Sequence, residues 1–345
     1  MESNHAPSLP PSSRFEFSPN FQTCRILNGM WQVSGAHGHI DADKAVESMF
    51  DYLDLGFTTW DLADHYGPAE DFIGEFRRRL VESRGLGALA DIQAFTKWVP
   101  RVGPMNRKVV EGNIDISMRR INVECLDLLQ FHWWNYEDER YLEAVGHLED
   151  LRNEGKIRHV GLTNFDTQIL QNIVDQGFEI VSNQVQYSLI DRRPQVRMAE
   201  YCERQGIHLL AYGALAGGLL TDRFLGQHEP SRAALDTASL AKYIRMIEAW
   251  GGWNLFQELL VTLRSIADRH QVSIADVAVR YVLECPAVAG VIVGVRLGVA
   301  DHREDNARVF SFSMDQQDLD QIDSVLSQSR DLYQIIGDCG DEYRR

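Results

Sequence analysis

Several features that would assign this chain to a familiar class are missing from its sequence. It has no run of about 18 apolar residues, which a membrane-spanning helix requires, and no basic stretch followed by an apolar segment near residue 1, which a secretory signal requires. Basic residues are few, because 34 Lys and Arg stand against 50 Asp and Glu, a net charge of −16. Nucleic acids and anionic membranes attract basic surfaces, so we expect neither as a partner and favour a small molecule.

Sequence signatures of disulfide, nucleotide and metal sites are also missing. The five cysteines form no Cys-x-x-Cys pair and lie mostly in apolar stretches, which is typical of reduced thiols and indicates a cytoplasmic protein. Neither a Gly-x-Gly-x-x-Gly motif after a strand nor a Gly-x-x-x-x-Gly-Lys motif occurs. His37, His39, Asp64 and His65 are close in sequence, but their spacing fits no tetrahedral zinc pattern. We therefore expect no metal.

What the sequence does contain is a repeated alternation of strands and helices. The 345 residues, 44% of them apolar, suffice for one large domain. We expect a flexible leader over residues 1–20, because it is rich in Pro and Ser, then a barrel over 21–330 and a C-terminal tail over 331–345. The expected helices are 41–55, 68–84, 106–121, 137–155, 166–176 and 194–205, and the expected strands are 57–61, 92–97, 125–131, 157–163, 179–186, 207–212 and 290–294.

This pattern predicts a closed (β/α)8 TIM barrel of class α/β. A further strand near 25–33 completes the set, or that segment forms a hairpin that plugs the barrel bottom. An open, doubly wound sheet fits less well, because the polar residues follow many strands and do not gather around one switch point. The segment 221–256 is too long for an ordinary loop and ends with Trp250 and Trp253, so we expect an insertion that covers the pocket or forms an oligomer contact.

Four polar residues stand at the ends of strand-like runs: Asp61, Lys97 and His132, with Tyr66 five residues after Asp61. In a barrel the carboxyl ends of all strands open on one face, so these side chains can converge. Taken alone, Asp61 can cap a helix, Lys97 can be a surface residue or a Schiff-base amine, and His132 can be structural. Together they suit proton transfer, because Lys97, held by Asp61, would stabilise a Tyr66 phenolate and lower its pKa.

Longer motifs around these residues resemble the aldo-keto reductase superfamily, over about residues 25–330. The segment 56–67 resembles the strand motif that carries the family's catalytic aspartate and tyrosine, and the segment 155–165 resembles a second family signature, with Thr163 in place of the usual serine. Lys97 and His132 fall where the family has its lysine and histidine. The resemblance implies four catalytic residues: Asp61, Tyr66, Lys97 and His132.

The same resemblance implies a set of cofactor contacts. A hydroxyl residue and two amide residues would hold the nicotinamide carboxamide, an aromatic residue would stack under the ring, and a glycine-rich loop with a basic residue would wrap the pyrophosphate. A segment after the last strand would bind the adenosine end, although its spacing is two residues longer than in some branches. The implied contacts are Thr163, Asn164, Gln184, Tyr212, Gly213, Ala214, Leu215, Gly217, Arg223, Gly294, Arg296, His302, Asp305 and Asn306.

The preferred cofactor is NADPH, since Arg296, with His302 or Arg303 nearby, offers cations to a 2′-phosphate. The resemblance thus implies reversible, NADPH-dependent reduction of aldehyde or ketone carbonyls, with Tyr66 as proton donor and His132 polarising the carbonyl oxygen.

Aromatic residues that follow strand ends indicate an apolar substrate pocket, for which the candidates are Trp31, Trp98 and Trp133, with Trp134 beside them. Two other functions stay open: a cofactor-binding regulatory subunit with little turnover, and a Schiff-base aldolase that uses Lys97.

Overall fold

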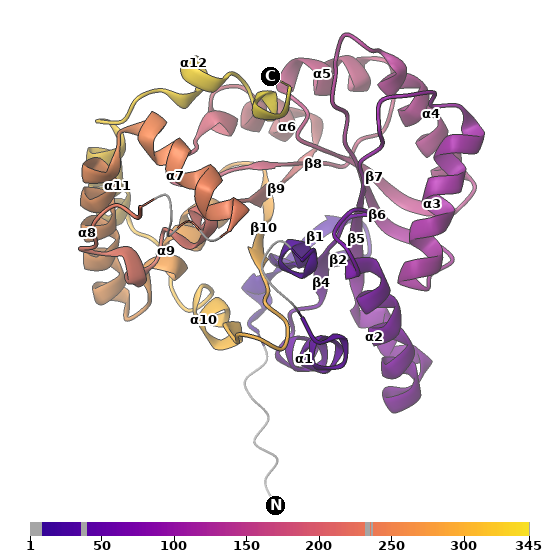
Figure 1. Cartoon of the computed structure of the whole chain (residues 1–345), viewed down its shortest axis with the longest axis horizontal. Helices are drawn as coiled ribbons and strands as arrows, with labels where there is room; N and C mark the ends of the chain where they lie inside the picture. Colours follow the sequence, from indigo (N-terminus) through magenta and orange to yellow (C-terminus); the bar gives the residue numbers. More distant parts are fainter. Residues whose placement is uncertain (1–8, 36–39, 232–234, 236, 345) are drawn as a thin grey trace, which may run out of the picture.

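The computed structural model describes residues 9–35, 40–231, 235 and 237–344. Within them eight parallel strands close into a barrel in the order β10-β3-β4-β5-β6-β7-β8-β9 (Figure 1). The prediction of a (β/α)8 barrel is therefore confirmed. The barrel strands are β3 (Ile26–Gly29), β4 (Thr59–Asp61), β5 (Gln93–Trp98), β6 (Leu126–Phe131), β7 (Ile157–Thr163), β8 (Ser182–Gln186), β9 (His208–Tyr212) and β10 (Val288–Gly294).

Helices surround the barrel, with α2, α3 and α4 on one side and α8, α9 and α11 on the other (Figure 1). Each buries an apolar stripe, as in α8, where Phe256, Leu259, Leu260 and Leu263 are buried at helical spacing and the helix packs on α9 and α11. The α-helices are α1 (Ala42–Leu55), α2 (Ala69–Arg84), α3 (Arg107–Ile121), α4 (Arg140–Asn153), α5 (Thr167–Asp175), α6 (Met198–Gln205), α7 (Ala238–Trp250), α8 (Trp253–His270), α9 (Ile274–Leu283), α10 (Arg303–Arg308), α11 (Gln316–Leu326) and α12 (Leu332–Ile336).

The connection from α1 to β4 shows how local sequence sets the chain direction. Asp41 caps α1 by accepting a hydrogen bond from the backbone N–H of Lys44, and Gly56 ends the helix with a left-handed backbone, φ 101°. The chain then reverses into Phe57, which is fully buried, and β4 follows. This turn delivers Asp61 to the carboxyl end of β4, at the mouth of the barrel.

A hairpin of β1 (Arg14–Ser18) and β2 (Phe21–Cys24) covers the opposite end of the barrel. Phe17 and Phe21 pack with Phe95, Leu128 and Leu210 in a separate apolar cluster inside the barrel. The expectation of a flexible leader over residues 1–20 does not hold for its second half, because the phenylalanines there find this apolar surface. The plugging hairpin therefore precedes residues 25–33, and that segment supplies barrel strand β3.

The segment 221–256 contains more structure than a loop. It holds the 3₁₀ turn η6 (Asp222–Phe224), the helix α7 and the start of α8. Trp250 is buried at the end of α7, whereas Trp253 opens α8 and donates a hydrogen bond to the backbone oxygen of Gln227 over 2.9 Å. Neither tryptophan borders the barrel mouth. No helix of the described residues is long and apolar enough to cross a membrane.

The part of the expected tail that the structure describes, residues 331–344, also has a defined course. After α12 the chain returns toward the barrel and forms the 3₁₀ turn η8 (Asp341–Tyr343). In Figure 1 this end of the chain lies near α5 and α6. The tail therefore places its last described residues at the barrel mouth.

Candidate active site

A cavity of about 1140 Å³ opens at the carboxyl ends of the strands. All the catalytic and cofactor-binding residues expected from the sequence line it, as does Trp31. The barrel thus brings together side chains from Asp61 to Asn306, which lie far apart in sequence.

Trp98 and Trp133, in contrast, were wrongly assigned to the substrate pocket. Trp98 follows the inward-facing Lys97 on β5, and Trp133 follows His132, so both point outward because side chains on an extended chain alternate between faces. Trp98 is buried against Phe131, with ring centroids 5.4 Å apart. The indole N–H of Trp133 donates to the backbone oxygen of Asn135 over 2.7 Å. The aromatic residue that reaches the cavity here is Trp134.

Asp61 and Lys97 form a buried ion pair at the floor of the cavity. Lys97 Nζ lies 2.5 Å from Asp61 Oδ2 and 2.8 Å from the backbone oxygen of Leu62. The other carboxylate oxygen of Asp61 accepts hydrogen bonds from the side-chain amides of Gln130 (3.2 Å) and Gln184 (2.7 Å). Burial lowers the pKa of Lys97, and the charge of Asp61 opposes that shift. The carboxylate therefore keeps the ammonium in one position.

Tyr66 lies beside this pair, but not in the expected arrangement. Lys97 Nζ contacts the Tyr66 ring, 4.9 Å from its centroid, while its hydrogen bonds go to Asp61 and Leu62. Burial, followed by the charges of Asp61 and two other groups, raises the pKa of Tyr66 well above its usual value. The expected lowering of that pKa by Lys97 is therefore not present in this geometry, because desolvation outweighs the nearby cation.

His132 is buried and neutral. Its Nδ1 lies 3.0 Å from the backbone oxygen of Thr163. Since a carbonyl oxygen can only accept, Nδ1 carries the proton. Burial lowers the His132 pKa to about 4. In this neutral ring Nε2 is an acceptor, and it has no hydrogen-bond partner among the described residues. The expected role of hydrogen-bond donor to a carbonyl oxygen does not fit this tautomer.

Two amide side chains line the cavity, Asn164 directly after β7 and Gln184 within β8. Gln184 donates both hydrogens of its amide, to Asp61 and to Gln130 Oε1, each over 2.7 Å. The side-chain oxygen of Gln184 is therefore the atom that remains available to a ligand. Asn164 has a left-handed backbone, φ 60°, and its Oδ1 accepts a hydrogen bond from the Tyr212 hydroxyl over 2.8 Å. These groups suit recognition of another amide.

The glycine-rich loop after β9 is packed tightly beneath α7. Gly213 and Gly217 have left-handed backbones, φ 77° and 68°, and a Cβ on either would collide with Tyr243 of α7. Arg223 at the end of this loop is exposed and lines the cavity. The loop thus presents backbone groups and one cation along the cavity wall.

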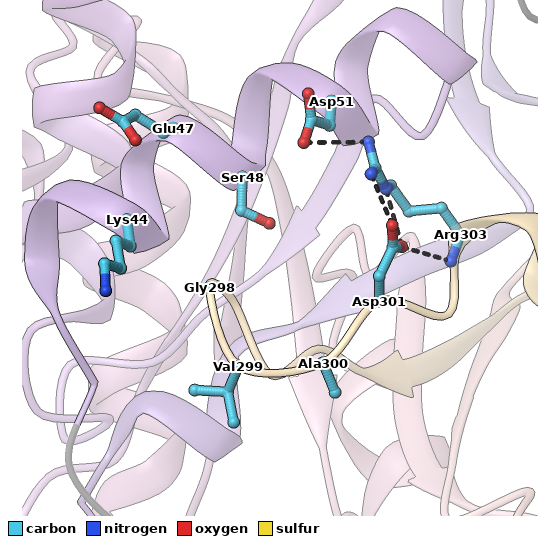
Figure 2. Close-up of a pocket in the computed structure, with 9 residues that line it drawn as sticks. All are labelled: Lys44, Glu47, Ser48, Asp51, Gly298, Val299, Ala300, Asp301 and Arg303. Atoms are coloured by element: carbon cyan, nitrogen blue, oxygen red, sulfur yellow. Dashed lines mark hydrogen bonds and ion pairs between the residues drawn. The ribbon is translucent and has the colours of Figure 1, made fainter.

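The far end of the cavity is lined by both basic and acidic side chains. Arg296 and His302 line it together with two carboxylates, Asp276 and Asp305. Arg303, which we considered as a cation for this end, instead lies in a separate groove of about 560 Å³ against α1 (Figure 2). There it binds Asp301 over 2.6 Å and Asp51 over 3.2 Å, so its charge is already neutralised.

Sequence reasoning missed three groups of the site. Lys242 and Tyr343 line the cavity wall, and the buried Gln130 supports Asp61 from behind it. Gln130 precedes His132 by two residues on β6, so the alternation of strand side chains could have indicated it. Lys242 in the insertion and Tyr343 in the tail had no such signal. Of the histidines weighed as metal ligands, His37 and His39 lie outside the described residues, and within the described ranges no group of three or more His, Cys, Asp or Glu could hold a metal ion.

Comparison with known proteins identifies the family and the fold. The family model described as "Aldo/keto reductase family" matches residues 25–327. The chain is 27% identical over 260 residues to flagellar radial spoke protein 5 of Chlamydomonas reinhardtii, which covers 64% of this chain but only 49% of that protein, about half its length. It is 22% identical over 295 residues to the NADH-specific methylglyoxal reductase of Escherichia coli, covering 78% of this chain and 85% of the relative.

A solved structure shares the fold. An aldo-keto reductase from Klebsiella pneumoniae in complex with NADPH superposes with a TM-score of 0.68 at 21% identity, over 91% of this chain and 95% of that one. At this level of identity the likeness shows the barrel architecture.

Proposed function

This chain belongs to the aldo/keto reductase family and is an oxidoreductase, and on that premise we propose that it reduces aldehyde or ketone groups with NADPH, with Tyr66 as the proton donor. Carbonyl reduction and use of a nicotinamide cofactor are supported in general by its relatives. The observation that carries the finer proposal is the convergence of Asp61, Tyr66, Lys97 and His132 on one cavity that is also lined by amide groups.

The cavity fits an elongated dinucleotide. Its volume of about 1140 Å³ exceeds the range of roughly 300–1,000 Å³ that is usual for small-molecule pockets. At one end the oxygen of Gln184 and the side chain of Asn164 can accept from and donate to a carboxamide. At the other end Arg296 supplies positive charge, and the loop at Gly213–Gly217 lies between the two ends. The residues present therefore fit the cofactor that the family implies.

In the proposed reaction a bound nicotinamide supplies hydride to the carbonyl carbon. The Tyr66 hydroxyl, which burial keeps protonated, donates its proton to the carbonyl oxygen. Lys97 lies over the ring and stabilises the phenolate that remains, while Asp61 holds the ammonium against its tendency to lose a proton. His132 Nε2 accepts a hydrogen bond from the hydroxyl of the alcohol. Trp31 and Trp134 border the site.

The preference for NADPH rests on the balance of charge at the far end of the cavity. Arg308 pairs with Asp305 and lies 3.8 Å from Asp276, so both carboxylates of this end have a cation beside them. Arg296 and His302 then face the cavity as the groups for a 2′-phosphate. One relative is named for NADH specificity and one structural neighbour holds NADPH, so the preference needs a direct test.

The test is nucleotide oxidation in the presence of a panel of aldehydes, ketones and dicarbonyl compounds, with NADPH and NADH in parallel. We expect turnover with NADPH, and we expect Arg296→Gln to weaken NADPH binding by about tenfold while NADH binding changes less than about twofold. Tight nucleotide binding without turnover on any carbonyl would instead favour the regulatory subunit. Equal effects of Arg296→Gln on both nucleotides would contradict the assignment of the 2′-phosphate site.

A further inference from the structure

Lys242 of α7 occupies an unusual position in the cavity wall. Its ammonium faces three phenol rings, with Nζ 4.9 Å from the centroid of Tyr343, 5.3 Å from Tyr212 and 5.5 Å from Tyr243. Nζ donates one hydrogen bond, to the Tyr343 hydroxyl, over 2.8 Å. Among the residues that the structure describes, Lys242 forms no ion pair with a carboxylate. An ammonium has three hydrogens to donate, so this cation has capacity for a ligand.

Tyr343 is held in place by the tail that carries it. The neighbouring Glu342 binds the buried Arg193 through two hydrogen bonds of 2.9 and 3.1 Å. On the other side, the guanidinium of Arg344 lies 3.9 Å from the ring centroid of Tyr136 and donates to the backbone oxygen of Trp133. The Tyr343 hydroxyl is therefore positioned by residues on both sides of it, and the nearby carboxylate of Glu342 is already paired.

This pair borders the place where the carbonyl would react. The Tyr343 ring centroid lies 6.1 Å from that of His132, and its hydroxyl is 3.1 Å from the hydroxyl of Tyr212. Both Lys242 and Tyr343 line the same cavity as Tyr66. A substrate that presents its carbonyl to Tyr66 would therefore share the cavity with Tyr343, which lies near His132, and with Lys242, which is bonded to the Tyr343 hydroxyl.

We propose that Lys242 and Tyr343 form an anion subsite that binds a carboxylate on the carbonyl substrate, so that the enzyme prefers aldehydes or ketones that carry an acid group. The predicted substrate preference rests on the proposed reductase function, whereas the predicted binding of a carboxylate does not. A carboxylate fits better than a phosphate dianion, because the subsite holds one cation and one hydroxyl. The surrounding phenol rings add attraction to the ammonium and exclude water, which strengthens its pairing with an anion.

The binding arm of the test uses the full chain saturated with NADP⁺ and two unreactive probes, benzoate and its neutral analogue benzamide, followed by calorimetry. Lys242→Gln is expected to weaken benzoate binding by about tenfold or more and to leave benzamide within about twofold. Lys242→Arg keeps the charge and should retain most of the affinity. The matched control is Lys108→Gln, which removes a positive charge from an exposed residue outside the cavity and should change neither probe.

The kinetic arm compares benzaldehyde with 2-, 3- and 4-carboxybenzaldehyde, and glyoxylate with glyoxal. We expect Lys242→Gln to lower kcat/KM for the acids by about tenfold or more through KM, and to leave the neutral aldehydes within about threefold. Tyr343→Phe should act in the same direction but more weakly. Phosphorylated aldehydes are added to the panel to test whether a phosphate occupies the subsite instead. If Lys242→Gln lowered kcat/KM for these substrates alone, the assignment to carboxylates would be wrong.

Two further results separate the possible failures. If Lys242→Gln weakens NADPH binding as much as benzoate binding, Lys242 serves the cofactor and the subsite proposal is wrong. If no carbonyl is turned over while benzoate binding still depends on Lys242, the reductase proposal fails and the anion subsite stands.

Discussion

Tyr66 combines a half-buried phenol with a cation over its ring, and these two features act in different ways. Burial raises its pKa, which keeps the hydroxyl protonated and ready to donate during reduction. The contact with Lys97 stabilises negative charge that develops only after the proton has left. Under the proposed mechanism, Tyr66 would therefore act as the proton donor in carbonyl reduction.

Tyr66→Phe removes the hydroxyl and keeps the ring that Lys97 and Trp31 contact. We expect kcat for carbonyl reduction to fall by roughly 10²- to 10⁴-fold, because general acid catalysis contributes that much. Affinity for NADPH, measured by fluorescence titration, should stay within about twofold. Near wild-type turnover by this variant would show that another group donates the proton.

His132 predicts a pH-dependent loss of stability. Its pKa is about 4 in the folded chain, below the ordinary value near 6.5 for an unfolded chain. As pH falls below 6.5 the unfolded state binds the proton first, so stability is complete above 6.5 and declines as pH falls toward 4. Between pH 7 and 5 this group should remove about 2 kcal/mol from the free energy of unfolding. Urea unfolding at pH 7 and at pH 5 measures this change in the free energy of unfolding. In His132→Gln the change between the two pH values should be smaller by about 2 kcal/mol. If the change were the same in the variant as in the wild type, the buried neutral ring would be contradicted.

At the scale of elements, most helices and strands could be predicted from periodicity, and the inserted helix and the tail could not. The helix expected at 41–55 is α1 (Ala42–Leu55), and the strand expected at 157–163 is β7, because an Asp cap, a terminal Gly and long apolar runs mark these ends locally. The helix α7 also has a capping residue, Thr237, and a terminal glycine, Gly251, but these local signals do not show where the helix packs. Its position depends on contacts with the glycine-rich loop, which sequence patterns do not record.

The tail illustrates the same limit at the site itself. Asp61, Lys97 and His132 could be found because each ends an apolar strand, whereas Tyr343 is brought to the cavity by the pairing of Arg193 with Glu342 across 149 residues of sequence. Trp98 and Trp133 show that a strand end alone is not enough. Strict application of the two-residue alternation along β5 and β6 would have assigned both to the outer face.

The anchoring of the tail can be measured through Arg193. This guanidinium is buried and binds Asp191 over 2.8 Å in addition to Glu342 and the backbone oxygen of Asp338. Arg193→Met leaves the buried carboxylate of Asp191 without its partner, so we expect a loss of about 3–5 kcal/mol in unfolding free energy and lower kcat/KM. Arg192→Met, at a half-exposed neighbour 4.0 Å from Asp323, should cost less than about 1 kcal/mol. Equal costs for the two variants in chemical denaturation would contradict an anchoring role.

For the whole molecule, the separation of the two barrel ends predicts that stability and chemistry can be changed independently. The hairpin of β1 and β2 fills the bottom, and the cavity lies at the mouth. Alternation of strands and helices made the barrel predictable, but the hairpin was hidden in a segment whose Pro and Ser content resembles a flexible leader. Its phenylalanines become structural only because the barrel bottom offers them an apolar surface.

Phe17→Ala tests this separation. Phe17 is buried and contacts Phe95, with ring centroids 5.7 Å apart. Its truncation should cost about 3 kcal/mol of unfolding free energy, since large-to-small changes at buried aromatic positions cost about that much. The folded enzyme should keep its kcat and its NADPH affinity at a temperature below the transition. Glu16→Ala, on the exposed side of the same strand, should change stability by less than about 0.5 kcal/mol. A fall in kcat for folded Phe17→Ala would show that the two ends are coupled.

The burial of Asp61 against Lys97 also restricts how such a sequence can drift over generations. A descendant that replaced either partner alone would carry an uncompensated charge in its interior and would lose stability as well as activity. Replacement of both by neutral groups of similar size leaves no uncompensated charge in the interior and avoids this loss of stability. A lineage that abandons catalysis but keeps the barrel should therefore lose the acid and the amine together.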